Sequence, residues 1–177
     1  PAGPPSVDNM NLMGWSDQGT DDGGQYYYDL ALDISPTNAD SIFVAGVNLW
    51  VSADGAASFV CPAKWSHSYK PNYVHADIHD VRYMSSTKEI CIACDGGIFY
   101  SNDNGESFER RITGISGTDF WGFGAGRRDP SVMLGGTYHN GTLLKDDTVY
   151  INDWVSTDGG DNYRGFVHPN LQRQAFS

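Results

Sequence analysis

Short runs of alternating apolar and polar residues recur along the chain and predict β-strands. Residues 28–34 (Tyr-Asp-Leu-Ala-Leu-Asp-Ile) have the period of two that is typical of a half-buried strand, and a turn rich in Pro, Asn and Asp follows over 35–40. Shorter strands are expected next at 41–46, 47–52 and 58–61. Because no segment has an apolar stripe with the 3.6-residue period of a helix, the pattern predicts an all-β fold.

This four-stranded unit returns along the chain after an irregular segment over 1–25. The first unit spans 26–65, and a second spans 73–115 with strands expected at 80–83, 89–94, 98–101 and 107–111. A weaker third unit covers 119–156, with strands expected at 120–125, 132–136 and 141–144 before a closing segment near Trp154. A further unit starts within 160–177, with a strand at 164–167. Repeats with a period of roughly 20–50 residues are typical of solenoids, propellers and arrays.

An octapeptide turn stands between the third and fourth strands of the first two units. Residues 52–59 and 101–108 share the pattern Ser-x-Asp-x-Gly-x-x-aromatic, with Ala56 in place of Gly in the first copy. Short Ser and Asp side chains accept hydrogen bonds from turn amides, Gly tolerates a positive φ, and the aromatic ring folds onto the sheet. Ala56 leads us to expect a slightly different first turn. The pattern assigns a structural role to Ser52, Asp54, Phe59, Ser101, Asp103, Gly105 and Phe108.

A third stretch, residues 156–163, fits this turn pattern only loosely. A first-strand pattern begins at Arg164 and leaves no room for a fourth strand. We therefore interpret 156–163 as the lead-in to the next unit.

With these turns the chain resembles the Asp-box (BNR-repeat) β-propellers, a group that includes sialidases, xyloglucan hydrolases and sortilin-type receptors. The closer resemblance is to large secreted Asp-box proteins of Bacteroidota, many of which are exported with a C-terminal sorting domain (type IX secretion). The runs that carry it lie at 24–31, 46–52, 75–79 and 95–98. The resemblance implies a β-propeller segment of about three to four four-stranded blades, in a secreted or cell-surface protein. Because a propeller closes a ring of about four to eight blades, we expect a longer polypeptide or neighbouring chains to complete it.

Composition and charge exclude some classes of binding partner. The chain has 177 residues and a formal net charge of −11, with 11 Lys and Arg against 22 Asp and Glu. Nucleic acid and anionic membranes need clustered basic residues, so neither is expected as a partner. No apolar run approaches the roughly 18 residues of a membrane-spanning helix, so no membrane insertion is expected. The chain starts without Met, and we expect that it was processed or trimmed.

The three cysteines are Cys61, Cys91 and Cys94, an odd number that cannot form a closed set of internal disulfides. Cys91 and Cys94 are three apart on a predicted strand and so face opposite sides. We interpret them as buried thiols. A redox or zinc pair is the alternative.

The segment 75–79 (His-Ala-Asp-Ile-His) is the leading candidate for chemistry. If it is extended, His75, Asp77 and His79 share one face with the spacing of metal ligands. Three interpretations stay open: a ladder of satisfied polar side chains, a ligand-binding surface, or a cation site. No other cofactor is expected. Asp77 and Asp95 are weak candidates for an acid–base pair.

Polar residues at the strand joins and rings in one loop are further candidates for ligand binding. Asp95, Asn140 and Asp161 occupy comparable places in successive units, where they cap sharp turns or line one mouth together with the His pair. Residues 65–73 hold Trp65, Tyr69 and Tyr73, on which glycans or peptides could stack; packing of this loop on neighbouring blades is the alternative.

The function expected from the sequence is non-catalytic: a secreted or cell-surface module that binds glycan or protein. A glycoside hydrolase with part of its site outside this chain is the first alternative. Against it, the three Glu residues are poorly placed for a sialidase-like site, and no Arg-Ile-Pro-like segment is present. A component or cargo of a larger bacterial surface or secretion assembly is the second alternative.

Overall fold

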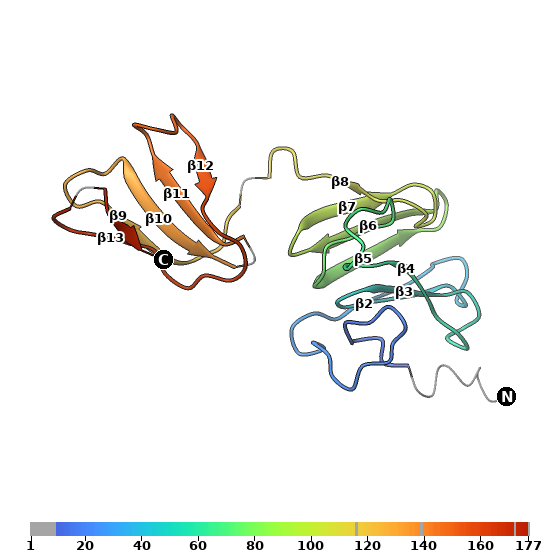
Figure 1. Cartoon of the computed structure of the whole chain (residues 1–177). Coiled ribbons are helices and arrows are strands. Elements are labelled where there is room, and N and C mark those ends of the chain that lie inside the picture. The colour runs from blue at the N-terminus through green and yellow to red at the C-terminus, as the bar shows by residue number, and fades with distance from the viewer. Residues whose placement is uncertain (1–9, 116, 139, 172, 177) are drawn as a thin grey trace. The chain divides into compact units, whose positions relative to one another are not determined.

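The computed structural model describes residues 10–115, 117–138, 140–171 and 173–176 (Figure 1). Residues 1–9 of the expected irregular segment and Ser177 of the last unit lie outside the described residues. The chain divides into two compact units, Pro1–Gly114 and Ile115–Ser177.

The first unit contains two four-stranded sheets, each an antiparallel meander in which strands pair in chain order. The first sheet comprises β1 (Ala31–Ile34), β2 (Ile42–Ala45), β3 (Leu49–Ser52) and β4 (Val60–Ala63). The second comprises β5 (Ile78–Met84), β6 (Glu89–Cys94), β7 (Gly97–Ser101) and β8 (Glu109–Arg110). Figure 1 shows the two sheets stacked face to face.

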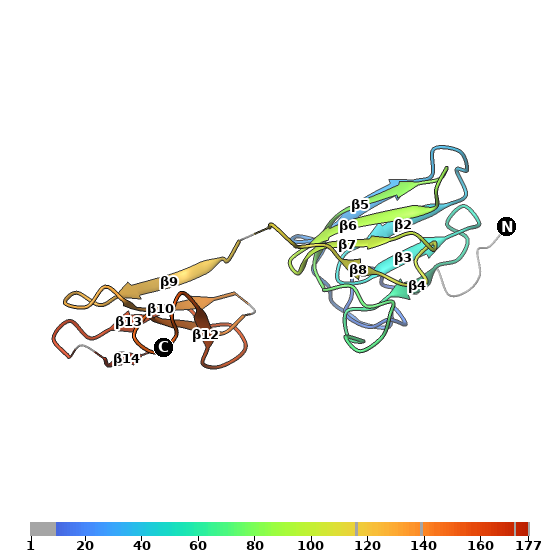
Figure 2. The same cartoon turned by 90° about the horizontal axis from the view of Figure 1, so that it is seen from above.

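The second unit repeats the meander and adds a strand pair. Its four-stranded sheet comprises β9 (Phe120–Ala125), β10 (Val132–Thr137), β11 (Thr142–Asp146) and β12 (Trp154–Ser156). The pair β13 (Phe166–Val167) and β14 (Ala175–Phe176) follows. β13 packs against β9 and β10, as Figure 2 shows.

The predicted fold class is confirmed: the chain is all-β and is built from four-stranded sheets of the propeller-blade type. The strands expected at 89–94 and 120–125 have those bounds in β6 and β9. Among the described residues there is no helix, and hence none long and apolar enough to cross a membrane.

The strand expected at 28–34 starts later than predicted, because Tyr28 belongs to a turn. The backbone amides of Tyr28 and Asp29 both donate to the carbonyl of Gln25, at 2.7 and 3.0 Å. These bonds close the chain into a turn, and β1 begins only at Ala31.

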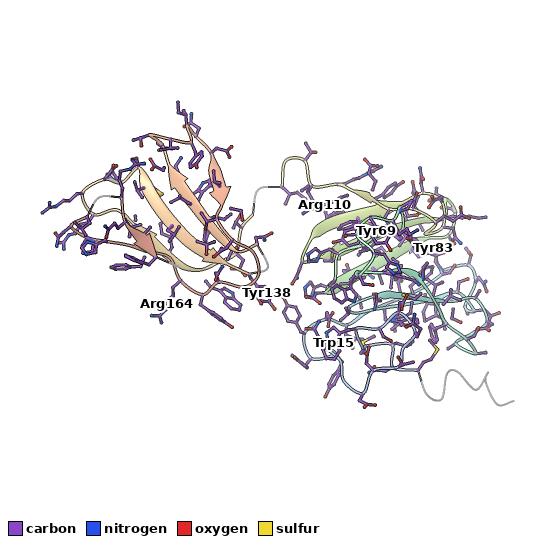
Figure 3. The ribbon with its side chains drawn as sticks, viewed as in Figure 1. Trp15, Tyr69, Tyr83, Arg110, Tyr138 and Arg164 are labelled. Atoms are coloured by element: carbon purple, nitrogen blue, oxygen red, sulfur yellow. The ribbon has the colours of Figure 1, made fainter. Side chains whose placement is uncertain are left out.

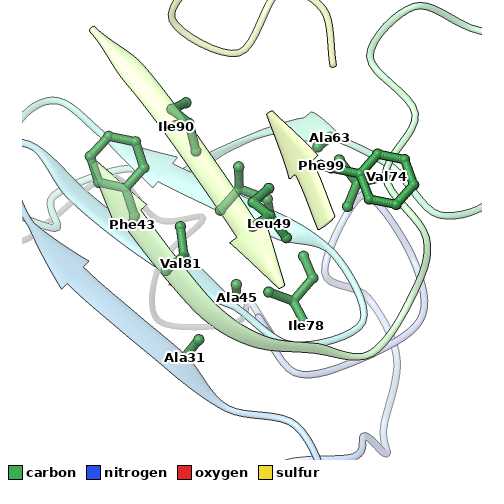
Figure 4. Close-up of a cluster of buried hydrophobic side chains, with 11 residues drawn as sticks. Ala31, Phe43, Ala45, Leu49, Ala63, Val74, Ile78, Val81, Ile90 and Phe99 are labelled. Atoms are coloured by element: carbon green, nitrogen blue, oxygen red, sulfur yellow. The ribbon is translucent and has the colours of Figure 1, made fainter. Parts of the chain in front are cut away.

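The main hydrophobic core lies between the two sheets of the first unit (Figure 4). Alternate residues of facing strands fill it, because successive side chains of a strand point to opposite faces. Its largest members are Phe43, Leu49, Ile78, Ile90, Ile92 and Phe99.

Two hydrogen bonds hold the stacked sheets of the first unit so that their corresponding ends lie together. The amide of Ile78, at the start of β5, donates to the carbonyl of Gly46 in the β2–β3 turn at 2.8 Å. Near the other end, the amide of Tyr83 donates to Asp33 Oδ2 at 2.7 Å. The first strands of the two sheets, β1 and β5, therefore start at the same end of the unit. We call the end where the first strand of a sheet begins its first-strand end.

Candidate functional site

The two ends of each sheet carry different chemistry. In an antiparallel meander, the start of the first strand and the turn between the second and third strands share one end. In the second sheet, this first-strand end holds Asp77 and Asp95, and the octapeptide turn between β7 and β8 lies at the opposite end. The residues with structural and ligand-binding roles predicted from the sequence are thus separated along the strands.

The first octapeptide turn is closed by its own side chains. Ser52 Oγ donates to Asp54 Oδ1 at 2.8 Å and accepts from the amide of Ala56 at 2.9 Å. Asp54 Oδ1 accepts from the amide of Ser58 at 2.8 Å, and Oδ2 accepts from Ser58 Oγ at 2.6 Å. Phe59 follows, half-buried. The Asp54 carboxylate is thereby committed to the turn.

The second octapeptide turn repeats these bonds. Ser101 Oγ donates to Asp103 Oδ1 at 2.7 Å and accepts from the amide of Gly105 at 2.9 Å. Asp103 accepts from the amide and hydroxyl of Ser107, at 3.0 and 2.5 Å. These donors favour the ionised carboxylate, and the bonds from Ser107 and then Ser101 lower the pKa of Asp103 to about 2. Phe108 packs against the core of the first unit.

The expectation that Ala56 gives the first turn a different shape is wrong. Gly55 and Ala56 have φ of 69° and 68°, and their counterparts Asn104 and Gly105 have φ of 63° and 88°. Ala56 therefore adopts a left-handed conformation that costs an L-residue energy. The shared hydrogen bonds hold it there.

Sequence reasoning missed the serines at the seventh position of each turn. Ser58 and Ser107 supply two of the bonds to each Asp. Their signal was in the sequence, since both copies place Ser directly before Phe.

The first-strand end of the second sheet gathers a polar group that we call the Asp95 cluster: Tyr28, Asp29, Asp77, His79 and Asp95. Asp95 Oδ1 lies 2.6 Å from His79 Nε2, and Asp95 Oδ2 accepts from the Tyr28 hydroxyl at 3.0 Å. The rings of Tyr28 and His79 meet edge to face, with centroids 5.1 Å apart. One carboxylate thus orients two aromatic side chains, both of which remain exposed.

Asp77 takes a different role from the one expected. Its φ of 63° breaks the extended run assumed for 75–79, so the expectation of a shared face for His75, Asp77 and His79 is wrong. Asp77 is buried, accepts from Gln25 Nε2 at 2.8 Å, and accepts from the amide of Asp95 through its backbone carbonyl at 3.2 Å. Among the described residues, no group of three or more His, Cys, Asp or Glu is placed to hold a metal ion.

His75 packs beneath the turn that carries Asp95. A Cβ added to Gly96 would lie 2.3 Å from the Cβ of His75, so only glycine fits there. Arg110 Nε donates to the carbonyl of Gly96 at 2.8 Å, which also holds the turn in place. The sequence predicted a turn here but not the close approach of His75.

Asp29 is the member of the cluster that sequence reasoning missed. It is 1% exposed, and neither carboxylate oxygen has a hydrogen-bond partner within the described part of the chain. Burial is the main cause that raises the pKa of Asp29 to about 6, with the negative charges of Asp77 and Asp95 acting in the same direction and His79 opposing them. Its only sequence signal was period-two register, which puts Asp29 on the same face as buried Ala31.

Asn140 and Asp161 belong to the second unit, and they do not occupy comparable places. Asn140 lies in the β10–β11 turn, as Asp95 does in the β6–β7 turn, but Asp161 lies between β12 and β13. The amide of Tyr138 donates to the carbonyl of Asp119 at 3.3 Å, which repeats the bond from Asp95 to Asp77. Tyr138 therefore stands where the second sheet has Asp95. A mouth shared by Asn140, Asp161 and the His pair stays a prediction.

In the aromatic loop at 65–73, one ring packs into the core and two are exposed. Tyr73 packs against Phe99 in the core, and burial raises its pKa. Trp65 Nε1 donates to the carbonyl of Trp15 at 2.8 Å, and both rings remain partly exposed. Tyr69 is 76% exposed, with the ammonium of Lys70 5.4 Å from its ring centroid. Only Trp65 and Tyr69 of the three predicted rings present a free surface.

No protein-family model and no curated protein sequence matches the chain. Among solved structures, it is similar to the GH74 enzyme of Niastella koreensis, with 12% identity, a TM-score of 0.39 and coverage of 82% of this chain and 22% of that one. It is also similar to the GH74 xyloglucanase of Xanthomonas campestris, with 14% identity, a TM-score of 0.36 and coverage of 81% and 25%.

A third similar structure is the β-propeller domain of Cps50 (Swd1) from Myceliophteria thermophila. It shares 10% identity at a TM-score of 0.31, with coverage of 79% of this chain and 46% of that chain. The chain thus spans less than half the length of each of these solved structures.

Proposed function

We propose that the chain is a non-catalytic β-propeller module that binds glycans at the first-strand end of its first unit. The observation that carries the proposal is the Asp95 carboxylate, which engages exposed Tyr28 and exposed His79 together. Tyr26 and Tyr27 precede them in sequence and are 68% and 80% exposed. A sugar has an apolar C–H face and a rim of hydroxyl groups, so exposed rings beside hydrogen-bond donors and acceptors suit it.

The proposal includes a partner that covers β1. Leu30, Leu32 and Ile34 point alternately outward and are 61%, 59% and 46% exposed. By contrast, Ile78 and Val81 of β5 are fully buried against the first sheet. A further four-stranded sheet, from a longer polypeptide or a neighbouring chain, is the occupant that matches this face. We also place the protein outside the cell, which fractionation of the native source with an antibody against this chain would test.

The experiment that tests glycan binding is isothermal titration with neutral hexasaccharides: cellohexaose, laminarihexaose and mannohexaose. Asp95→Asn weakens both bonds of the carboxylate and is expected to raise Kd about tenfold, because bonds to a charged group are worth about 1.5–3 kcal/mol. Asp22→Asn, at an exposed position outside the cluster, serves as the matched control. The proposal fails if no hexasaccharide saturates the folded protein or if Asp95→Asn binds like the unsubstituted chain.

A glycoside hydrolase is the second candidate, because the cluster pairs a carboxyl of raised pKa with a second carboxyl group. Asp29 has a pKa of about 6, and Asp95 lies near the surface. Such unequal pairs serve as acid and base in glycoside hydrolysis. However, Asp29 is 1% exposed, which leaves a sugar no access to it in this unit. Release of shorter sugars from the same hexasaccharides, abolished by Asp29→Asn, would replace the binding proposal with this one.

A further inference from the structure

Three aromatic rings stack at the first-strand end of the second unit. Trp121 of β9 lies 4.7 Å from Tyr138 with an interplanar angle of 21°, and 4.5 Å from Tyr163 at 36°. Tyr138 is in the β10–β11 turn, and Tyr163 is in the segment between β12 and β13. We call this group the Trp121 stack.

The stack is not part of the core of the second unit. That core is formed by Val132, Leu134 and Val167, with Leu144 and Ala175 packed against it. Trp121 is 42% exposed and Tyr163 is 67% exposed. Their rings therefore meet one another while leaving a large apolar area open to solvent.

Glycines hold the Tyr163 segment directly against the sheet. A Cβ added to Gly122 would lie 2.4 Å from the carbonyl oxygen of Tyr163, and one added to Gly136 would lie 2.4 Å from that of Asn162. Backbone therefore rests on backbone, which places the Tyr163 ring beside Trp121.

Hydrogen bonds fix the same segment along its length. The amide of Asn162 donates to the carbonyl of Thr137 at 3.1 Å. Asp158 Oδ1 accepts from the amide of Thr142 at 2.7 Å and from Asn162 Nδ2 at 3.0 Å. The stack is thus ordered before any ligand arrives, which lowers the entropic cost of binding.

The groups around the stack are polar. Residues 158–164 (Asp-Gly-Gly-Asp-Asn-Tyr-Arg) contain no aliphatic side chain. Arg164 is exposed and has no hydrogen-bond or ion-pair partner among the described residues, and Figure 3 shows it along the same edge of the unit as Tyr138. Arg164 offers donors at this edge, and exposed Asn140 lies beside the rings, with its Nδ2 donating to the carbonyl of Tyr138 at 3.2 Å.

We propose that the Trp121 stack is a binding platform for a neutral oligosaccharide, which lays a sugar ring on Tyr163 and directs its hydroxyl groups to Arg164. A flat ring face beside the exposed guanidinium of Arg164 matches the apolar C–H face and the hydroxyl rim of a sugar. The net charge of −11 and the nearby Asp158 and Asp161 disfavour an anionic sugar. The platform has the ligand class of the proposed function but lies on a different unit, so each can fail alone.

The test is isothermal titration of the full chain with cellohexaose, and with hexagalacturonic acid as the anionic counterpart. Loss of one stacking ring costs about 1 kcal/mol, so Tyr163→Ala is expected to raise Kd about fivefold or more. Tyr163→Phe keeps the ring and should stay within about twofold of the unsubstituted chain. Tyr150→Ala removes a tyrosine of the same unit, 40% exposed in the turn between β11 and β12 at the opposite end of the sheet, and should leave Kd unchanged.

Three results would overturn the platform. They are an unchanged Kd for folded Tyr163→Ala, equal weakening by Tyr150→Ala, and tighter binding of hexagalacturonic acid than of cellohexaose. If Asp95→Asn weakens binding while Tyr163→Ala does not, the platform fails and the proposed function stands. The reverse pattern retains the platform and removes the Asp95 cluster as the glycan site. Absence of saturable binding by any hexasaccharide removes both.

Discussion

The hydroxyl of Ser107 donates to Asp103 Oδ2 at 2.5 Å, and Ser58 makes the same bond to Asp54 at 2.6 Å. The two pairs lie in separate sheets, yet each Asp also receives the amide of its Ser. A turn that is rebuilt so closely at two places is specified by its local sequence. Its stability should therefore respond to substitutions in ways that local physics predicts.

Acid should weaken the second turn through Asp103. Its pKa is about 2 in the folded chain and about 3.9 in a model peptide, so its contribution is complete above about pH 4 and is lost as the pH falls towards 2. Asp103→Asn should lower the free energy of unfolding by roughly 1 kcal/mol at pH 7, and this difference should shrink towards pH 2. Urea denaturation at pH 7, 4 and 2.5 measures it, with Asp22→Asn as control. A difference that does not change with pH would contradict the prediction.

Glycine at position 56 should stabilise the first turn. Ala56 has a φ of 68°, a conformation that costs an L-residue about 1–2 kcal/mol and glycine almost nothing. After the entropy that glycine adds to the unfolded chain, Ala56→Gly should raise the free energy of unfolding by about 0.5–1 kcal/mol. The neighbouring Ala57 has no positive φ, so Ala57→Gly should lower it by a similar amount. Thermal and urea unfolding of both variants decide the matter, and opposite signs are the required outcome.

Stability should decrease between about pH 4 and pH 6 because of Asp29. Its pKa is raised to about 6 in the folded chain, so the folded state holds a proton that the unfolded state releases near pH 4. The favourable contribution is present below the unfolded pKa and disappears as the pH rises through 6. Asp29→Asn, which stays neutral, should remove about 1–2 kcal/mol of this decline. Urea unfolding at pH 4.5 and pH 7.5 gives the comparison, and an unaltered decline in the variant would exclude Asp29 as its source.

Substitution of Gly96 should be severe and should depend on His75. A Cβ at position 96 would lie 2.3 Å from that of His75, so Gly96→Ala must displace the turn that carries Asp95. We expect a loss of about 2–3 kcal/mol, of which a large part returns in the double variant with His75→Gly. Gly23→Ala is the control, because its nearest heavy atom would lie at 3.4 Å. Additive losses in the double variant would show that His75 is not the obstacle.

The strands and turns could be predicted because their signals are local. Alternation marked β6 and β9 to the residue, and the Ser and Asp positions of the octapeptide turns follow from side chains that bond to amides within four residues. The start of β1 was misplaced for the opposite reason. Tyr28 alternates correctly in sequence, but two backbone bonds to Gln25 place it in a turn.

The candidate sites were predicted only in part. His79 and Asp95 were expected near one mouth, and they pair across 16 positions of the chain because β5 and β6 are neighbours. Asp29 and the Trp121 stack were missed. An Asp in an alternating run is normally solvent-facing, and three rings spread over 42 positions of the chain show no spacing that a repeat pattern would reveal.

The amino-acid sequence alone determined the class of the fold, the repeat of four strands and the two octapeptide turns. Each of these depends on contacts within a few residues, where hydrogen bonding and alternation act directly. Only the tertiary structure decided which polar groups meet: it buried Asp29 beside Asp77, turned Asp77 out of its extended run, and brought Trp121, Tyr138 and Tyr163 together. These contacts join segments that are distant in the chain, and the packing of whole sheets sets their geometry.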